Sequence, residues 1–167
     1  ELWQWSVDHV EDFWEAVSQY FKVIFHRPYS SVLKGQKMPE FTWFDGATLN
    51  YAEHVFRHQT DENPAIIFKQ EGKEVQETTW AELAQKVASL AAFMKSKGVT
   101  KGDRVVAYIP NIPEATIGFL AACSLGAIWS SCSPDFGASS VVDRFQQIEP
   151  KLLITVDGYQ YGGKSFN

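Results

Sequence analysis

The stretch GYQYGGKS, residues 158–165, matches the phosphate-loop pattern G-x-x-x-x-G-K-[ST]. In such a loop, backbone N–H groups surround phosphate oxygens, a lysine neutralises their charge and a hydroxyl group holds a magnesium ion. Lys164 and Ser165 occupy the lysine and hydroxyl positions. However, Tyr159 and Tyr161 would crowd the phosphates, and we expect no helix directly after Ser165 to add its dipole. An exposed turn therefore explains the pattern better than a nucleotide-hydrolysing site, and Lys164 remains a candidate phosphate contact.

A second polar stretch, SSCSPDFG at residues 130–137, directly follows an apolar run. Cys132 could act as a thiolate nucleophile only beside a base or cation, and all four histidines lie in the N-terminal third of the chain. We therefore expect Cys132 to be a small buried residue. Asp135 could bind a ligand, although an Asx-type turn explains it equally well.

The second half of the chain alternates strands and helices. Strands are predicted over 104–109, 127–131 and 152–156, and helices over 113–125 and 140–148. This βαβαβ order indicates the α/β class, with a doubly wound, mainly parallel sheet and right-handed crossovers. Ligands of such sheets bind beyond the carboxyl ends of the strands, so the 130–137 turn should face a crevice.

The first half should form a helical cap followed by a hairpin. Apolar spacing predicts a helix from Asp8 to Phe21, with Asp8 as N-cap and Glu11 completing a capping box. The remaining predicted elements are an ordered loop over 27–47, a short helix over 49–58, a hairpin with strands 65–69 and 75–78, and a helix opened by a Thr79/Glu82 capping box and ended by Gly98.

These elements predict a cap region over 1–62 and the start of a larger α/β domain over 63–167. The cap contains many aromatic residues, which we expect to form core: Trp3, Trp5, Trp14, Trp43 and Phe44. Two alternative functions remain open: a phosphate-loop NTPase that uses residues 158–165, and a non-catalytic interaction module in which this aromatic N-terminus docks a partner.

Composition limits the class of protein. The 167 residues are 45% hydrophobic with a net charge of −5, which favours a globular chain and argues against a nucleic-acid partner. Two cysteines are too few for a disulfide framework, so we expect a reducing, cytosolic location. Residues 115–134 carry no charge, but their glycines and serines favour a buried helix and strand over a membrane span.

Three segments carry a resemblance to a known family: WFDGATLNYAEH at 43–54, the long run from GDRVVAYIP to SSCSPDFG at 102–137, and VVDRFQQIEPKLLITVDGY at 141–159. They resemble the N-terminal part of the adenylate-forming acyl-CoA synthetases, in the acetyl-CoA synthetase-like branch. Nearly the whole chain takes part in this resemblance.

The resemblance implies a two-step ligase that uses ATP, Mg²⁺ and coenzyme A. A carboxylic acid, here acetoacetate, would attack the α-phosphate to give an acyl-adenylate and pyrophosphate. The CoA thiol would then displace AMP, and the acetoacetyl-CoA would feed lipid synthesis. The family's phosphate loop and catalytic lysine should lie downstream, so no catalytic residue or metal ligand is assigned here. The expected partner of this segment is the remainder of the same protein chain. We therefore expect this segment alone to be inactive.

The resemblance also places two CoA contacts of the family on residues of this chain, when the two sequence patterns are aligned. A basic pair that contacts the CoA phosphates in this branch falls at Tyr161 and Lys164, of which only Lys164 keeps the charge. A glycine beside the CoA path falls at Pro134 or Asp135. The resemblance thus implies Lys164 and Asp135 as cofactor-binding residues. The departures at Tyr161 and at Pro134 or Asp135 indicate either a shifted CoA path or a different register of the match.

Overall fold

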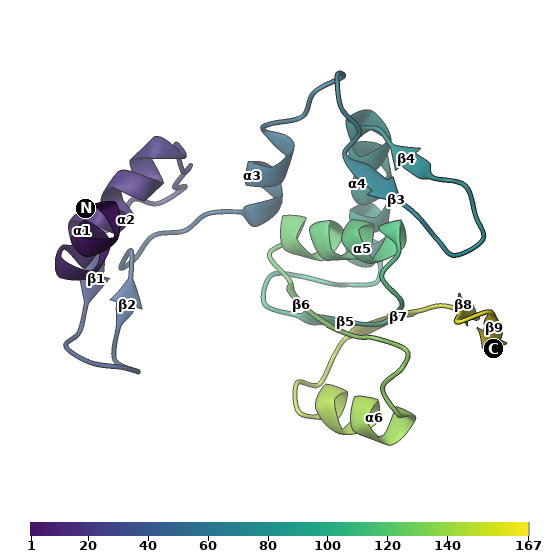
Figure 1. The fold of residues 1–167 in the computed structure, drawn as a ribbon. Coiled ribbons are helices and arrows are strands. Elements are labelled where there is room, and N and C mark those ends of the chain that lie inside the picture. Colours follow the sequence, from purple (N-terminus) through teal and green to yellow (C-terminus); the bar gives the residue numbers. More distant parts are fainter. Residues whose placement is uncertain (167) are drawn as a thin grey trace. The chain divides into compact units, whose positions relative to one another are not determined.

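A computed structural model describes residues 1–166 and divides the chain into two compact units, Glu1–Leu49 and the part that starts at Asn50 (Figure 1). Each unit has its own secondary structure, so each is described by itself. The second unit contains the predicted α/β sheet and the candidate site.

The first unit consists of two helices and a short ladder. Helix α1 spans Leu2–Asp8 and α2 spans Val10–Tyr20, while the two-residue strands β1 (Leu33–Lys34) and β2 (Thr42–Trp43) pair antiparallel. The predicted capping box is wrong, because His9 is the N-cap of α2 and no side chain caps that helix. Asp8 instead ends α1, where its carboxylate accepts a hydrogen bond of 2.8 Å from Gln4 Nε2.

Most of the aromatic residues that were expected in the core of this unit are exposed. Trp14 packs edge-to-face on Trp43 with ring centroids 5.9 Å apart, yet both side chains are exposed. Trp3 is 72% exposed. The core prediction is therefore wrong for the four tryptophans, which are exposed, whereas Phe44 is half-buried and packs against Phe25 and Tyr29.

The second unit begins with the short helix and hairpin that the sequence predicts. Helix α3 spans Tyr51–Phe56, strands β3 (Ile66–Phe68) and β4 (Gln76–Thr78) pair antiparallel, and α4 spans Trp80–Ser96. Both hydrogen bonds of the Thr79/Glu82 capping box are present at the start of α4. Gly98, with φ of +83°, follows the helix end as predicted, because a side chain would be strained there.

A three-stranded parallel sheet lies at the centre of this unit, in the order β6-β5-β7. Its strands are β5 (Arg104–Tyr108), β6 (Ile128–Cys132) and β7 (Leu152–Thr155), joined through helices α5 (Pro113–Ser124) and α6 (Ala138–Gln146). The α/β prediction is confirmed, with boundaries within a few residues of those expected.

The two helices cover opposite faces of the sheet (Figure 1). Alternate residues of β5 point to opposite faces, so Val105 joins the core under α5 and Val106 joins the core under α6. Both side chains are fully buried. Burial on both faces explains why the run RVVAY is almost continuously apolar.

Residues 158–166 form a final hairpin rather than a loop that enters a helix. Strands β8 (Tyr159–Tyr161) and β9 (Lys164–Phe166) pair antiparallel around Gly162 and Gly163, both at positive φ. Within residues 1–166, no helix combines the length and apolar character needed to cross a membrane. The uncharged segment 115–134 divides between α5, β6 and the turn after it.

Candidate site at the carboxyl edge of the sheet

Two cavities that share Pro134 and Tyr159 lie where the parallel strands end. The larger, of about 320 Å³, is lined by Pro110, Asn111, Ser133, Pro134, Asp135, Tyr159, Gln160 and Tyr161. The other, of about 260 Å³, shares Pro134 and Tyr159 with it and reaches Tyr108 and Asp157. The lining residues follow the carboxyl ends of β5, β6 and β7, so the predicted crevice is confirmed.

The turn after β6 is held by its own side chains and by a neighbouring strand. The Ser133 hydroxyl donates a hydrogen bond to Asp135 Oδ1, and the backbone N–H of Phe136 donates to the Ser133 carbonyl at 3.1 Å. The Tyr108 hydroxyl lies 2.9 Å from the carbonyl oxygen of Pro134 and 2.8 Å from that of Phe136. The guanidinium of Arg144 lies over the Phe136 ring, 4.9 Å from its centroid.

Asp135 is an ionised acceptor at the mouth of the larger cavity. Hydrogen bonds from Ser133 and from its own backbone N–H lower the pKa of this carboxyl below its ordinary value. A carboxylate so stabilised repels phosphate and attracts N–H or O–H donors. Asp135 is thus suited to an amide or amino group of a ligand and unsuited to its phosphates.

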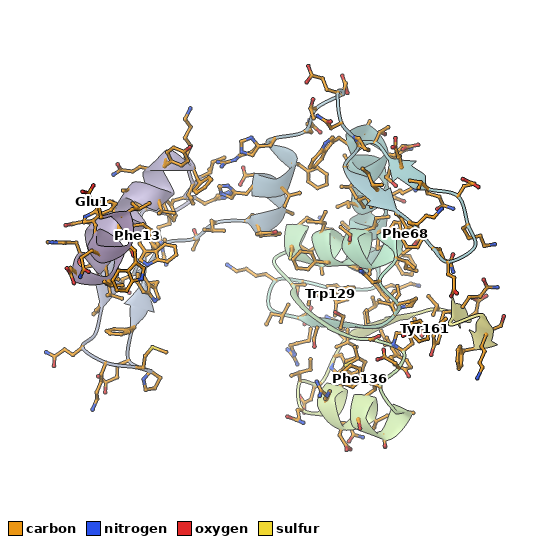
Figure 2. The ribbon with its side chains drawn as sticks, in the orientation of Figure 1. Glu1, Phe13, Phe68, Trp129, Phe136 and Tyr161 are labelled. Carbon is orange, nitrogen blue, oxygen red and sulfur yellow. The ribbon has the colours of Figure 1, made fainter. Side chains whose placement is uncertain are left out.

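Lys164 and Tyr161 lie opposite each other in the β8–β9 hairpin. Tyr161 lines the larger cavity, although most of its surface is exposed (Figure 2). The Lys164 side chain makes no ion pair or hydrogen bond among residues 1–166 and is exposed. The structure thus brings the register-matched pair together on one hairpin, and Asp135 shares the larger cavity with Tyr161.

The hairpin argues against the phosphate-loop alternative. Backbone groups of Tyr159–Tyr161 pair with those of Lys164–Phe166, so they cannot surround a phosphate as that loop requires. The turn is also tied to the β3–β4 loop, because Gly163 N–H donates to Glu71 Oε2 at 3.3 Å. The pattern at 158–165 is therefore a hairpin with glycines at its turn.

The two thiols show no sign of a nucleophilic site. Cys132 is buried in the core under α6 as expected, and Cys123 lies half-buried on α5. Burial raises the pKa of the Cys123 thiol, which favours the unreactive protonated form. Within residues 1–166, no three His, Cys, Asp or Glu side chains come together as a metal site would require.

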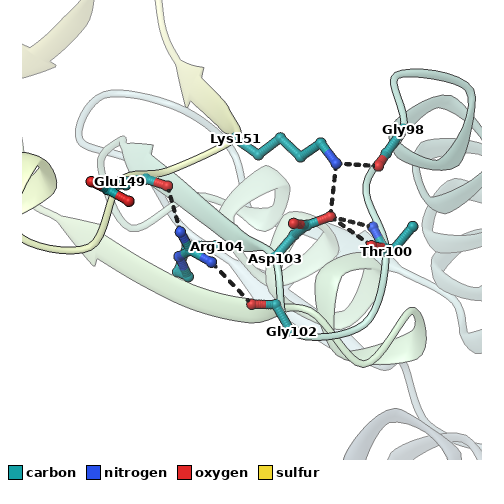
Figure 3. Close-up of polar contacts among 7 residues, drawn as sticks. All are labelled: Gly98, Thr100, Gly102, Asp103, Arg104, Glu149 and Lys151. Atoms are coloured by element: carbon teal, nitrogen blue, oxygen red, sulfur yellow. Dashed lines mark hydrogen bonds and ion pairs between the residues drawn. The ribbon is translucent and has the colours of Figure 1, made fainter.

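A second polar cluster lies at the opposite, amino-terminal edge of the sheet and has a structural role (Figure 3). The Asp103 carboxylate accepts hydrogen bonds from the Thr100 backbone N–H at 2.7 Å and from Lys151 Nζ at 3.0 Å. Arg104 donates to the carbonyls of Ile148 at 2.6 Å and Glu149 at 3.0 Å. These contacts tie the start of β5 to the segment that leads into β7.

Asp103 should make this cluster sensitive to acid. The Thr100 backbone N–H, followed by Lys151, lowers the pKa of Asp103 from 3.8 to about 2. A carboxyl with a lower pKa in the folded state stabilises the fold above its unfolded pKa and loses that effect as pH falls. Urea unfolding from pH 6 to 2 should show stability dropping between about pH 4 and 2 relative to Asp103→Asn. Parallel profiles for the two proteins would contradict this prediction.

Comparison with known proteins identifies two family models that match the chain. Residues 52–165 match the family described as AMP-binding enzyme, and residues 1–55 match the acetyl-coenzyme A synthetase N-terminus. The chain is 46% identical to an acetoacetyl-CoA synthetase of Macaca fascicularis over 98% of its own length and 25% of that protein. An acetoacetyl-coenzyme A synthetase of Rhizobium meliloti (strain 1021) is 45% identical over 96% of this chain and 24% of its own length.

A solved structure shows the same fold. The acetoacetyl-CoA synthetase from Streptomyces lividans superimposes with a TM-score of 0.92 at 53% identity, covering 97% of this chain and 25% of that one. The chain thus spans about a quarter of the length of the relatives it matches.

Proposed function

The chain belongs to the AMP-binding enzyme family, and on that premise we propose that it forms part of an ATP-dependent, AMP-forming acid–CoA ligase that acts on acetoacetate. The observation that carries the proposal is the 53% identity and TM-score of 0.92 to the Streptomyces lividans acetoacetyl-CoA synthetase. Residues 1–62 would be its cap region and 63–167 the start of its large α/β domain.

In the proposed reaction, a carboxylate oxygen of acetoacetate attacks the α-phosphorus of ATP, and pyrophosphate leaves. The CoA sulfur then attacks the acyl carbon of the adenylate, forming the thioester as AMP leaves. Mg²⁺ enters bound to ATP and offsets the phosphate charge. The product acetoacetyl-CoA would feed lipid synthesis in the cytosol, and the partners would be small molecules and the remainder of the chain, with no nucleic acid.

Within this reaction, the carboxyl edge of the sheet would serve the second step. Lys164 is an exposed cation without an ion pair among residues 1–166, as a contact for CoA phosphates requires. Asp135 is ionised and would accept a hydrogen bond from an amide or amino group of CoA. The two residues are therefore assigned different parts of the same ligand.

Product analysis with the full-length protein tests the proposal. The protein is supplied with ATP, Mg²⁺ and CoA, and in turn with acetoacetate, acetate, propionate or no acid, and AMP and ADP are measured. We expect AMP and pyrophosphate with acetoacetate and little with the other acids. Release of ADP without any acid would overturn the proposal in favour of a nucleotide hydrolase.

The exposed aromatic surface of the first unit supports one alternative function, that of a non-catalytic module that only docks a partner. Membership of an enzyme family weighs against this rival. The same assay separates the two functions, since a docking module forms neither AMP nor ADP with any acid.

A further inference from the structure

Tyr108 is the last residue of the central strand and lies between the ends of both neighbouring strands. In the parallel ladder it is opposite Cys132 of β6 and Thr155 of β7. Its ring packs against the core under α6, while its hydroxyl reaches past that core to the turn after β6. The ring and the hydroxyl therefore have separable roles.

The hydroxyl contacts the two backbone groups that flank Asp135. Its distances to the carbonyl oxygens of Pro134 and Phe136 are 2.9 Å and 2.8 Å, so its single hydrogen is shared between them. The turn also has internal bonds from Ser133 to Asp135 and from Phe136 to Ser133, but these fix only its shape. Tyr108 ties this turn to the central strand, while Arg144 of α6 contacts the Phe136 ring from the helix side.

We propose that Tyr108 is a positioning residue for thioester formation, in which its hydroxyl holds the 133–136 turn and the Asp135 carboxylate along the path of the entering thiol substrate. This inference rests on the proposed function. Pro134 lines both cavities of the carboxyl edge, so a shift of the turn would change the shape of both. Small displacements of groups that position a substrate have large kinetic effects.

Tyr108→Phe in the full-length protein isolates the hydroxyl, because phenylalanine keeps the ring in its core. The lost bond should raise the KM for CoA roughly 3- to 10-fold. Exchange of pyrophosphate into ATP, which reports adenylate formation alone, should stay unchanged with acetoacetate. Hydrogen exchange of the Phe136 amide should become faster, because the turn is no longer tied to β5.

Tyr29→Phe is the matched control, since it removes a tyrosine hydroxyl bonded at 2.9 Å to Glu15 in the first unit. It should leave both the KM for CoA and the exchange of Phe136 unchanged. An unaltered KM for CoA or an unaltered Phe136 exchange in Tyr108→Phe would overturn the inference, as would an equal loss in both half-reactions. If the wild-type protein forms no thioester, the proposed function fails instead, and Phe136 exchange alone then decides whether Tyr108 holds the turn.

Discussion

Replacing Gly118 with valine should lower the free energy of unfolding by about 3 kcal/mol, the upper end of the usual cost of overpacking. Gly118 is buried on the face of α5 that meets the sheet. A Cβ at this position would lie 2.8 Å from Trp129 Cη2 and 3.3 Å from Ile154 Cδ1. Because the indole is rigid and packs edge-to-face on Phe119, it cannot move aside cheaply.

A graded series separates this clash from helix propensity. Alanine gains about 1 kcal/mol of helix propensity over glycine, which partly offsets its clash, so Gly118→Ala should be much milder than Gly118→Val. Thr116→Val places the same side chain on the exposed face of α5 and should change stability little. Urea unfolding of the three variants gives the comparison. Equal stabilities for Gly118→Val and Thr116→Val would show that Trp129 and α5 do not pack as described.

The alternation of the second half could be predicted because each element carries its own signal. The run RVVAY is apolar throughout since both faces of β5 are buried, and Thr79 and Glu82 mark the start of α4 within four residues. Such local patterns need no knowledge of distant partners. The close approach of Gly118 to Trp129 is different, because it depends on how α5 lies on β6.

The prediction of a capping box at Asp8 was wrong because a contact between two aromatic side chains determines where the helix begins. Trp5 of α1 packs edge-to-face on Phe13 of α2, with ring centroids 5.4 Å apart, and this favours a break between the helices. His9, with φ of −127°, leaves the helical region at that break. A capping pattern alone cannot show which of two adjacent helices a carboxylate serves.

The sequence predicted the position of the candidate site in the fold but not all of the residues that form it. Its position follows from the rule that ligands bind at the carboxyl ends of parallel strands, which led to the turn containing Asp135. Tyr108 was missed, since a tyrosine at the end of an apolar strand carries no sign of the carbonyls that its hydroxyl reaches. The exposed turn expected at 158–165 is present at Gly162 and Gly163, but the sequence did not predict that short strands on either side of it pair as a hairpin.

Lys164→Ala in the full-length protein should raise the KM for CoA about 10- to 100-fold, as expected when a charge-assisted hydrogen bond to a phosphate is lost. Adenylate formation, measured as exchange of pyrophosphate into ATP with acetoacetate, should be nearly unchanged. The two steps separate because the lysine is assigned to CoA, which takes part only in the second. Lys164→Arg keeps the charge and should retain most of the affinity.

Lys101→Ala gives a control of equal charge at the opposite edge of the sheet. Lys101 is exposed and precedes β5, so it lies at the amino-terminal edge with Asp103, away from the cavities. If the positive charge acts only through the overall field of the protein, both variants should weaken CoA binding alike, and both effects should fade together as salt screens the field. An effect confined to Lys164→Ala identifies a local phosphate contact, whereas equal loss in both half-reactions would contradict the assignment of Lys164 to CoA.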